Sequence, residues 1–495
     1  MITNKINILL TLILTSSLVK TYSQTERELT LEQVISLAQE QSLDAFISKN
    51  LYLSKYWDFR SYKASRRPWL EFNPDNSSYS NSIETITDKN GTYLQRSDQL
   101  NLKSQLSLSQ NVALTGGKIG IYSYIGRLQD LTKSDSNVYF SSVPISIAFN
   151  QPLFQYNAQR WDKKIEPLKF DIAKKEYIES VENIALTAVN QFFNLLDAQQ
   201  DYKIAGLNKT TADTLYKKSQ GRYERGGLAY NDLQRLELNM LNAKLEYERA
   251  QLSLERVKFN LKSYLRLPEN ENIKLILPLE IPSLKIVPQN ALEKALENNP
   301  DILNFRQRML VADQQIAIAK GTNGINSSIN MNFGLGKSSE IFKDAYYDLD
   351  KDRGITLSLY VPIIDWGSSK GEREVAKFNK EVVTAQVEQD RIKFEQDVVM
   401  SAIEFNMLKS QLESAAKANA ISEKTYKTIE DRFLLGRESI ETLYAARNER
   451  DNAIKSYYSK IREYWAYFYY MRSLTLYDFI ENKSLSQSFD DFFGF

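Results

Sequence analysis

The chain has 495 residues, which is too long for one ordinary hydrophobic core, so we expect several domains or one extended repetitive body. It carries 63 Lys and Arg against 62 Asp and Glu, with no long block of one sign, which argues against nucleic acid as a partner. It contains no Cys and no His, and this excludes disulfides, Cys/His zinc sites and catalysis by imidazole. A hydrolase with two carboxylates is the enzyme class that this leaves, but no spacing singles out a pair, so we expect no enzyme, no cofactor and no metal site.

The N-terminal end has the pattern of a secretory signal peptide over residues 1–23. Lys5 precedes an apolar run from Ile6 to Val19, and small or polar residues follow before Gln24. The alternative, a membrane anchor, needs about 20 apolar residues. No later stretch is long and apolar enough for a spanning helix, so the mature chain could enter a membrane only as a β-barrel.

Two motifs of the first half recur in the second half. "RYERGGLAYNDL" (Arg222–Leu233) returns 210 residues later as "RFLLGRESIETL" (Arg432–Leu443). Upstream, "LEQVISLAQEQSLD" (31–44) lines up with "PQNALEKALENNPD" (288–301). We therefore predict an internal duplication. The predicted parts are the signal peptide (1–23), repeat one (24–277), a linker (278–286), repeat two (287–481) and a mobile tail (482–495).

Strands are predicted in the middle of each repeat, at about 69–150 and about 325–362. In "QLNLKSQLSLSQN", Leu100, Leu102, Leu106 and Leu108 fall on one face, and small polar residues fall on the other. A strand between lipid and a wet lumen needs this alternation. A soluble β-sandwich would show it too, and the long flanking helices argue against that alternative.

Long helices are predicted on both sides of each glycine break. After the first break, apolar residues from Leu233 to Tyr264 recur with a period of 3.5, which indicates a left-handed coiled coil. The segments before the breaks, from about Pro167 to Ser219 and from about Lys370 to Arg432, would be ~80 and ~90 Å long. Helices of that length belong to a coiled-coil body.

Together these motifs resemble the TolC family of outer-membrane efflux channels, the outer membrane factors of tripartite export systems. The resemblance covers nearly the whole mature chain. It rests on the entry motifs, the two glycine turns and two strand-to-helix motifs, "FNQPLFQYNAQRWDKK" and "YVPIIDWGSSKGER". The strand-to-helix residues that we single out are Pro152, Leu153, Phe154, Pro362, Trp366 and Gly367.

The resemblance implies a mixed α and β membrane protein. Three chains would pool their strands into one outer-membrane β-barrel, continuous with a long periplasmic α-helical coiled-coil barrel. The channel would be a passive exit duct for efflux or type I secretion in a Gram-negative cell. It would join an inner-membrane pump through a periplasmic adaptor and open by an iris-like movement.

The two glycine turns would be the periplasmic tips of helical hairpins that dock to the adaptor. Asn231 and Asp232 could cap the returning helix, and the alternative to docking is that the motif serves only to turn the chain. The family's acidic gate position falls on Asp232 in the first copy but on Thr442 in the second, which puts an acidic constriction in doubt. The candidate docking residues are Arg222, Tyr223, Gly226, Gly227, Leu233, Arg432, Phe433, Gly436 and Leu443, and the candidate gate residues are Asp232, Arg437, Glu438 and Glu441.

Two alternatives bear on these predictions. The aromatic run from Tyr457 to Tyr470 suits helix packing better than a membrane girdle, for which Trp69, Tyr360 and Trp366 are better placed. The competing function is an exported trimeric coiled coil with a β head, structural or adhesive, whose helices are only a stalk. Such a stalk needs neither the duplication nor strands with one polar face.

Overall fold

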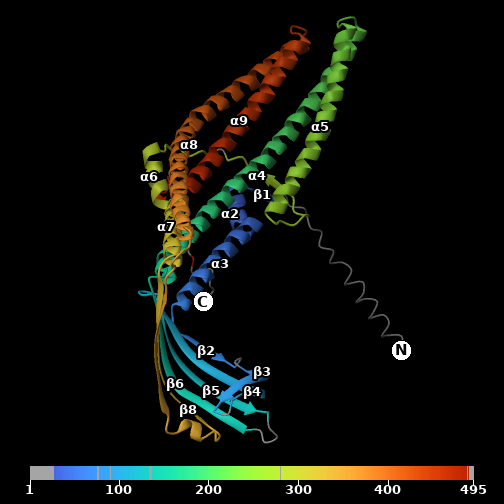
Figure 1. Ribbon diagram of the computed structural model, residues 1–495. Helices are drawn as coiled ribbons and strands as arrows, with labels where there is room; N and C mark the ends of the chain where they lie inside the picture. The colour runs from blue at the N-terminus through green and yellow to red at the C-terminus, as the bar shows by residue number, and fades with distance from the viewer. Residues whose placement is uncertain are drawn as a thin grey trace, which may run out of the picture. The chain divides into compact units, whose positions relative to one another are not determined.

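The computed structural model describes residues 27–74, 77–89, 91–132, 137–278, 280–487 and 489, so the predicted signal peptide and the end of the predicted tail lie outside it. Among these residues no helix is both long and apolar enough to cross a membrane. The chain forms two compact units (Figure 1). Unit 1 comprises Met1–Asn50, Glu176–Asn299 and Glu395–Phe495, and unit 2 comprises Leu51–Lys175 and Pro300–Phe394.

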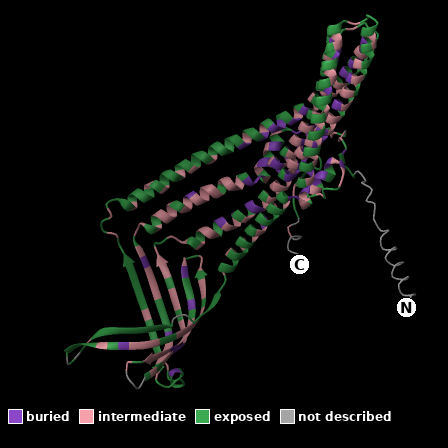
Figure 2. Cartoon of the chain, turned by 90° about the vertical axis from the view of Figure 1, so that its right-hand side faces the viewer, coloured by how far each residue is buried: buried purple, intermediate pink, exposed green. Residues whose placement is uncertain are grey.

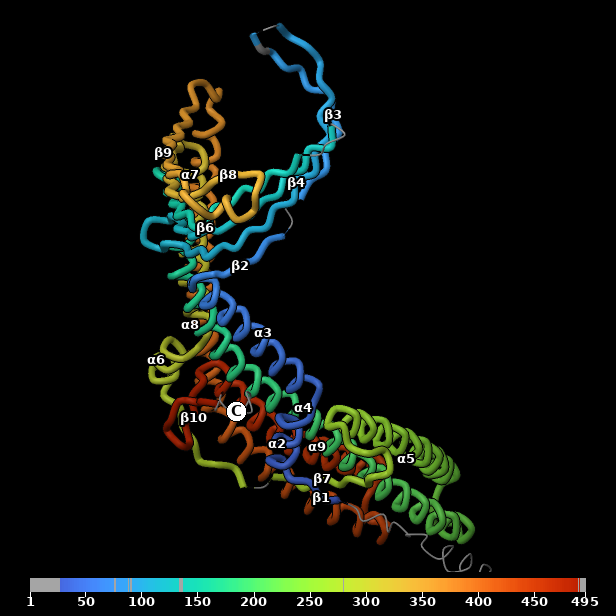
Figure 3. The backbone as a smooth tube through the Cα atoms, turned by 90° about the horizontal axis from the view of Figure 1, so that it is seen from below, coloured from blue at the N-terminus to red at the C-terminus, as the bar shows by residue number. Residues whose placement is uncertain are grey.

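Unit 2 contains one antiparallel sheet to which both predicted repeats contribute. Its order is β2-β4-β5-β6-β8-β9, with β3 also paired to β4, and the sheet is open in the described residues. The first part of β4 pairs with β3 alone, so this hairpin extends beyond the other strands (Figure 3). The strands are β2 (Trp69–Asn73), β3 (Ser78–Asp88), β4 (Gly91–Val112), β5 (Gly117–Asp130), β6 (Asn137–Leu153), β8 (Asn326–Ser339) and β9 (Asp350–Tyr360).

Helices lead into and out of the sheet. Two of them, α4 (Ala158–Glu224) and α8 (Ser368–Leu434), have 67 residues each and continue into unit 1. In unit 2, α3 (Leu43–Ser65) packs on α4, with the rings of Phe59 and Phe170 stacked at 4.5 Å. The helix α7 (Pro300–Thr322) is joined to α8 by ion pairs instead, such as Lys380 to Asp313 at 2.5 Å.

Unit 1 contains the other ends of α4 and α8 and the helices that return from them, α5 (Tyr230–Tyr264) and α9 (Ile440–Thr475). The short helices α2 (Leu31–Gln41) and α6 (Pro288–Asn298) follow β1 (Arg27–Leu29) and β7 (Ile273–Leu275), which pair in parallel. The strand β10 (Tyr477–Asp478) pairs with β11 (Lys483–Ser484), so the predicted mobile tail from residue 482 begins with paired residues. The seam predicted on α5 is buried at Leu236, Ala243 and Leu261.

The end of α9 is tied to α4 by a buried ionic cluster. The Arg472 guanidinium donates from Nε to Glu182 at 2.7 Å and also pairs with Asp478. Burial by itself would lower the pKa of Arg472, but these carboxylates hold it above its usual range. The Tyr464 hydroxyl donates to the Pro282 carbonyl at 2.7 Å, which ties the predicted linker to α9.

Candidate functional site

The first glycine turn closes α4 with two backbone hydrogen bonds. The Gly226 N–H donates to the Tyr223 carbonyl and the Gly227 N–H donates to the Arg222 carbonyl, both at 2.8 Å. Gly226 has φ +72°, a left-handed conformation that residues with a Cβ rarely adopt. This pair of bonds is a Schellman motif, which ends a helix by satisfying its last carbonyls.

The second turn has the same geometry 210 residues later. The Gly436 N–H donates to the Phe433 carbonyl and the Arg437 N–H donates to the Arg432 carbonyl, both at 2.9 Å, and Gly436 has φ +73°. The second motif therefore does not need a glycine after Gly436, because only the position of Gly436 is left-handed. The two sequence motifs therefore form the same backbone structure.

The returning helices are capped differently. Ser439 caps α9, and its Oγ accepts from the Thr442 N–H at 3.2 Å. Ala229 occupies the same position before α5, and its methyl side chain cannot accept a hydrogen bond. The expectation that Asn231 and Asp232 cap α5 is wrong, because the helix already begins at Tyr230 and both residues lie inside its first turn. Asp232 is half-buried there, where a negative charge suits the helix dipole.

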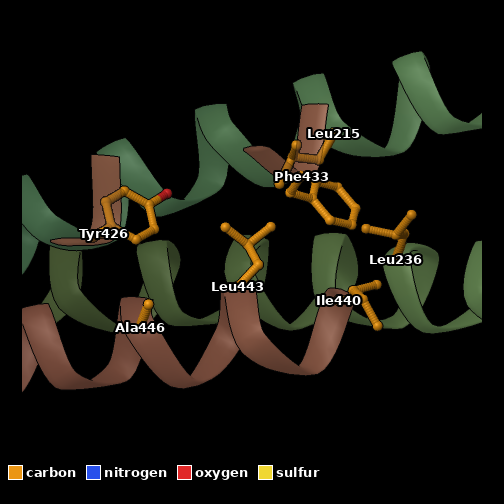
Figure 4. Close-up of a cluster of buried hydrophobic side chains, with 7 residues drawn as sticks. All are labelled: Leu215, Leu236, Tyr426, Phe433, Ile440, Leu443 and Ala446. Atoms are coloured by element: carbon orange, nitrogen blue, oxygen red, sulfur yellow. The ribbon is translucent and has the colours of Figure 1, made fainter. Parts of the chain in front are cut away.

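The helices α4 and α5 form hairpin one, and α8 and α9 form hairpin two. An apolar cluster, which we call the tip cluster, joins the two hairpins inside unit 1 (Figure 4). Phe433 and Leu443, which the sequence suggested as docking residues, are 5% and 1% exposed and lie in this cluster. In contrast, Tyr223 on the other hairpin is 40% exposed, and Leu233 is half-buried. The tip cluster consists of Leu215 on α4, Leu236 on α5, Tyr426 and Phe433 on α8, and Ile440, Leu443 and Ala446 on α9.

Polar contacts between the hairpins surround the cluster. The exposed pair Arg235 and Glu441 joins α5 to α9, and the Arg447 guanidinium donates to Asn239 Oδ1 at 3.1 Å. The Glu441 carboxyl accepts from its own backbone N–H and from Ser439, and with the Arg235 charge these contacts hold its pKa below the usual range. Glu441 on α9 thus contacts the hairpin of α4 and α5.

The remaining gate candidates make local contacts or are exposed. Glu438 accepts from Arg432 at 3.5 Å within hairpin two, and Arg437 is exposed. Arg235 and Arg450, which do join the hairpins, were not singled out from the sequence. A charged residue on an otherwise apolar seam, such as Arg450, was the signal that could have identified one of them.

A polar groove of about 560 Å³ is lined by α4, α5 and α9 between the hairpins. Its walls include Asn208, Asn239, Arg447 and Asp451, so it is lined mainly by hydrogen-bonding groups. Among the described residues, no group of three or more Asp or Glu could hold a metal ion.

The sheet of unit 2 has an exposed apolar face. Ile147 on β6 is 43% exposed and lies between Ile121 and Phe333, which are 42% and 47% exposed. The same face continues to the two edges of the sheet, and few residues of its strands are buried (Figure 2). Its members include Leu70, Phe72, Leu106, Leu108, Ile119, Ile121, Ile145, Ile147, Met331, Phe333, Ile355 and Leu357.

The opposite face is made of small and polar residues. Ser146 on β6 lies between Tyr122 and Gly334, and further along Asn150 lies beside Asn330. A soluble sandwich would bury the apolar face and expose the polar one. This sheet has no second layer on its apolar face within the described part of the unit.

The strand-to-helix motifs expose large apolar side chains next to this sheet. Phe154 follows Pro152 and Leu153 at the end of β6, is 77% exposed and has φ +63°. After Pro362 in the second motif, Trp366 is 95% exposed with φ +53°, and Gly367 has φ +90°.

Asp365 fixes the turn before α8 by accepting from the Gly367 and Ser369 N–H groups, both at 3.0 Å. The other two candidate girdle residues, Trp69 and Tyr360, are each 64% exposed.

Comparison with known proteins agrees with this geometry. The outer membrane efflux protein family model matches residues 291–458. The pyoverdine export outer membrane protein OpmQ of Pseudomonas aeruginosa is 21% identical over 337 residues, which cover 64% of this chain and 68% of that protein. Residues 291–458 therefore carry the pattern of the outer membrane efflux protein family.

Solved structures of outer-membrane proteins share the fold of this chain. The CmeC outer membrane channel of Campylobacter jejuni superposes with a TM-score of 0.65 at 14% identity, covering 93% of this chain and 90% of that one. The outer membrane protein VceC of Vibrio cholerae gives 0.61 at 13% identity, covering 90% and 95%. The predicted mixed α and β fold is confirmed by these structures, and the proteins that the chain resembles are outer-membrane proteins, among them an exporter and a channel.

Proposed function

We propose that this protein is the passive exit duct of a tripartite efflux or type I secretion system. Three chains would pool their strands into one multi-pass β-barrel in the outer membrane, and their long helices would form a coiled-coil barrel in the periplasm. A periplasmic adaptor and an inner-membrane pump would be its partners. The chain would supply a path and the pump the energy.

The observation that carries this proposal is the exposed apolar face of the sheet with its polar opposite face. Twelve apolar residues named above would face lipid, and the row through Ser146 and Asn150 would face a water-filled lumen. Water is a poor solvent for so large an apolar area, and at about 25 cal/mol per Å² its coverage by lipid is strongly favourable.

The open sheet and exposed helix stripes favour a homotrimer. Strand β9 forms one edge of the sheet, β2 and β3 form the other, and a second copy of the chain can pair with such edges. On α5, exposed apolar residues recur at heptad spacing away from the buried seam, which is the pattern of a second coiled-coil contact. That stripe consists of Leu238, Leu241, Leu245, Leu252 and Phe259.

An internal duplication is supported by contacts as well as by motifs. Tyr56 on α3 lies 6.1 Å from the ring of Phe170 on α4. The corresponding positions of repeat two, 257 and 210 residues later, are Asp313 and Lys380, and these two form the ion pair between α7 and α8. The same helix faces therefore meet in both repeats, with aromatic contact in one and charge in the other.

The hairpin turns would dock to the adaptor and open by an iris-like movement. Exposed Tyr223, Arg437 and the two glycine turns are the surfaces that an adaptor could reach. Both members of the Arg235 and Glu441 pair are exposed, and such screened pairs are easily exchanged for contacts with a partner.

Deletion of the gene tests the proposal. The deletion strain should accumulate dyes, antibiotics or, by analogy with the pyoverdine exporter, a pyoverdine-like metabolite, and a plasmid copy should restore export. Normal export of every compound in such a panel by the deletion strain would contradict the proposal. A vector without the gene is the control.

A further inference from the structure

Lysine and arginine side chains gather where α3 and α4 meet the sheet of unit 2. The Gln110 side chain of β4 donates to the Arg66 carbonyl at 3.2 Å. The Asn157 side chain, just before α4, donates to the Ala113 carbonyl after β4, also at 3.2 Å. The end of α3 and the start of α4 therefore reach the same rim of the sheet. Seven residues there form what we call the basic collar: Arg60, Lys63, Arg66, Arg67, Arg160, Lys163 and Lys164.

The basic collar lies at the level where a lipid layer around the sheet would end. Leu114, in the turn between β4 and β5 at this rim, is 88% exposed, and Trp69, the first residue of β2, is 64% exposed. Exposed tryptophan is typical of the boundary between hydrocarbon and headgroups. Every collar residue lies within about 9 Å of the helix end at the rim. The headgroup layer is about 5 to 8 Å deep, and lysine and arginine side chains can extend into it.

Carboxylates do not neutralise the basic collar. Residues 60–67 and 160–164 contain a single acidic residue, Asp162, which is half-buried. Its burial and the neighbouring Glu166 raise the pKa of Asp162 more than nearby cations lower it. Six of the seven collar residues are exposed, and between described residues no ion pair links any of the seven to a carboxylate. The collar is therefore a positive surface with free hydrogen-bond donors.

Aromatic rings position some of these charges without neutralising them. The Lys63 Nζ lies 4.4 Å from the centre of the Phe59 ring on α3. On α4, the Lys164 Nζ lies 5.1 Å from the centre of the Trp161 ring. A ring attracts the cation through its quadrupole but carries no net charge. The ammonium groups thus keep their charge and their N–H donors for another partner.

The equivalent part of repeat two carries less positive charge. At the offsets of 257 and 210 residues, the matching segments are 317–324 and 370–374, and they contain three cations and two carboxylates. One of these carboxylates, Glu372, accepts from the Asn323 side chain at 2.5 Å. Both repeats join helix to strand at the same rim of the sheet. The excess charge of repeat one is therefore not needed for the junction itself.

We propose that the basic collar binds the headgroups of anionic phospholipids in the periplasmic leaflet of the outer membrane. This inference rests on the proposed function, because a barrel with periplasmic helices places the helix side of the rim at that leaflet. The ammonium and guanidinium groups match a phosphate headgroup that carries a net negative charge. The adjoining apolar face of the sheet would contact the acyl chains of the same lipids. A soluble anion would gain the first contact but not the second.

The two repeats supply matched variants for a test. Each variant replaces two lysines and one arginine at equivalent positions, and all six side chains are exposed, so both should fold. Equal melting temperatures in detergent without added lipid would show that they do. The collar variant is Lys63→Gln/Arg160→Gln/Lys163→Gln, and the repeat-two variant is Lys320→Gln/Lys370→Gln/Arg373→Gln.

The measurement is lipid binding by the purified full-length protein in neutral detergent. Phosphatidylglycerol is the anionic probe and phosphatidylethanolamine is the zwitterionic comparison, and native mass spectrometry counts the bound lipids during each titration. The wild-type protein and the repeat-two variant should bind phosphatidylglycerol at least about tenfold more tightly than phosphatidylethanolamine, and the collar variant should lose most of this preference. Added salt should weaken the binding of phosphatidylglycerol.

Three results would overturn the proposal. The first is equal binding of the two lipids by the wild-type protein, which needs no variant to observe. The second is an equal loss of phosphatidylglycerol binding in the two triple variants. The third is displacement of the bound lipid by an excess of inorganic phosphate, because it would assign the basic collar to a soluble anion.

The failure of this proposal and the failure of the proposed function give different results. Lipid binding is measured on the purified protein, whereas export is measured in the deletion strain. Absence of a lipid preference together with lost export in the deletion strain would remove the collar proposal alone. Normal export by the deletion strain would remove the exit-duct role and leave the measured lipid preference in place.

Discussion

Arg450 carries a positive charge into a nearly dry interface between α4, α8 and α9. Its guanidinium is compensated by Asp451, by Asn208 and by the face of Tyr426, and its side chain is 9% exposed. A charge held in this way contributes little net stability when complete, but it costs several kcal/mol when one partner is removed. The stability of this site therefore depends on Arg450 keeping all of these partners.

We predict that Asp451→Ala destabilises unit 1 by about 3 to 5 kcal/mol, since it leaves a buried guanidinium without its carboxylate. Arg450→Met, which installs the residue found at the equivalent position 240, should cost clearly less. Thermal melting of the purified protein in detergent would measure both. The control is Glu246→Ala, whose pair with Arg249 is exposed and within one helix turn. Equal losses for Asp451→Ala and Glu246→Ala would refute the assignment.

Tyr464 makes the stability of the fold depend on pH in the alkaline range. Its burial raises its pKa to about 12, above the value of about 10 for an unfolded chain. The folded state therefore favours the protonated hydroxyl, which donates to the Pro282 carbonyl. This contribution is complete below pH 10 and is lost as the pH rises toward 12.

Tyr464→Phe removes both the hydrogen bond and its titration. We expect the wild-type protein to be more stable than this variant by about 1 kcal/mol near pH 8, and the difference to vanish or reverse between about pH 10 and 12. Melting curves across this range would show it. Exposed Tyr230→Phe serves as the control, and a gap that stays constant with pH would contradict the role given to Tyr464.

At the scale of elements, the two hairpins have the same turn geometry but differ in how the returning helix is capped. Ser439 supplies the oxygen that the first turn of α9 needs, whereas Ala229 leaves the first turn of α5 without one. The turn geometry follows from the left-handed glycine and is independent of the cap. The caps can therefore be exchanged without changing the path of the chain.

Exchanging the caps should shift stability in opposite directions. We expect Ser439→Ala to cost about 1 kcal/mol and Ala229→Ser to gain a similar amount. Limited proteolysis at each turn, together with melting, would measure this. If Ala229→Ser weakened hairpin one, the helix start placed at Tyr230 would be wrong.

Local sequence patterns predict most of the helices and strands, but they do not predict which of these pack against each other. The alternation around Leu100 to Leu108 predicts β4, and the period of 3.5 after Leu233 predicts α5 and its buried seam, because both signals lie within a few residues. Strand β3 has no such local signal, since residues 78–88 mix polar and apolar side chains on both faces. The place of Arg450 was also hidden, because its compensation by Asn208 comes from 242 residues away.

At the scale of the whole molecule, the chain carries two features of opposite character. The sheet exposes its apolar face, whereas the two helical hairpins bury apolar side chains between them in the tip cluster. The first feature suits a lipid environment, and the second suits a water-filled compartment in which the helices stay folded as pairs. An exit duct that passes from one medium to the other needs both.

The most direct test of the central claim compares two arginine substitutions at adjacent positions of β6. Ile147→Arg places a charge on the apolar face and should cost about 2 to 4 kcal/mol in lipid, whereas Ser146→Arg places it on the polar face, where a lumen would tolerate it. The measurement is the amount of folded protein in the isolated outer membrane. The account predicts that Ile147→Arg is depleted at least tenfold while Ser146→Arg stays near the wild-type level. Equal levels for the two variants, or a loss confined to Ser146→Arg, would contradict it.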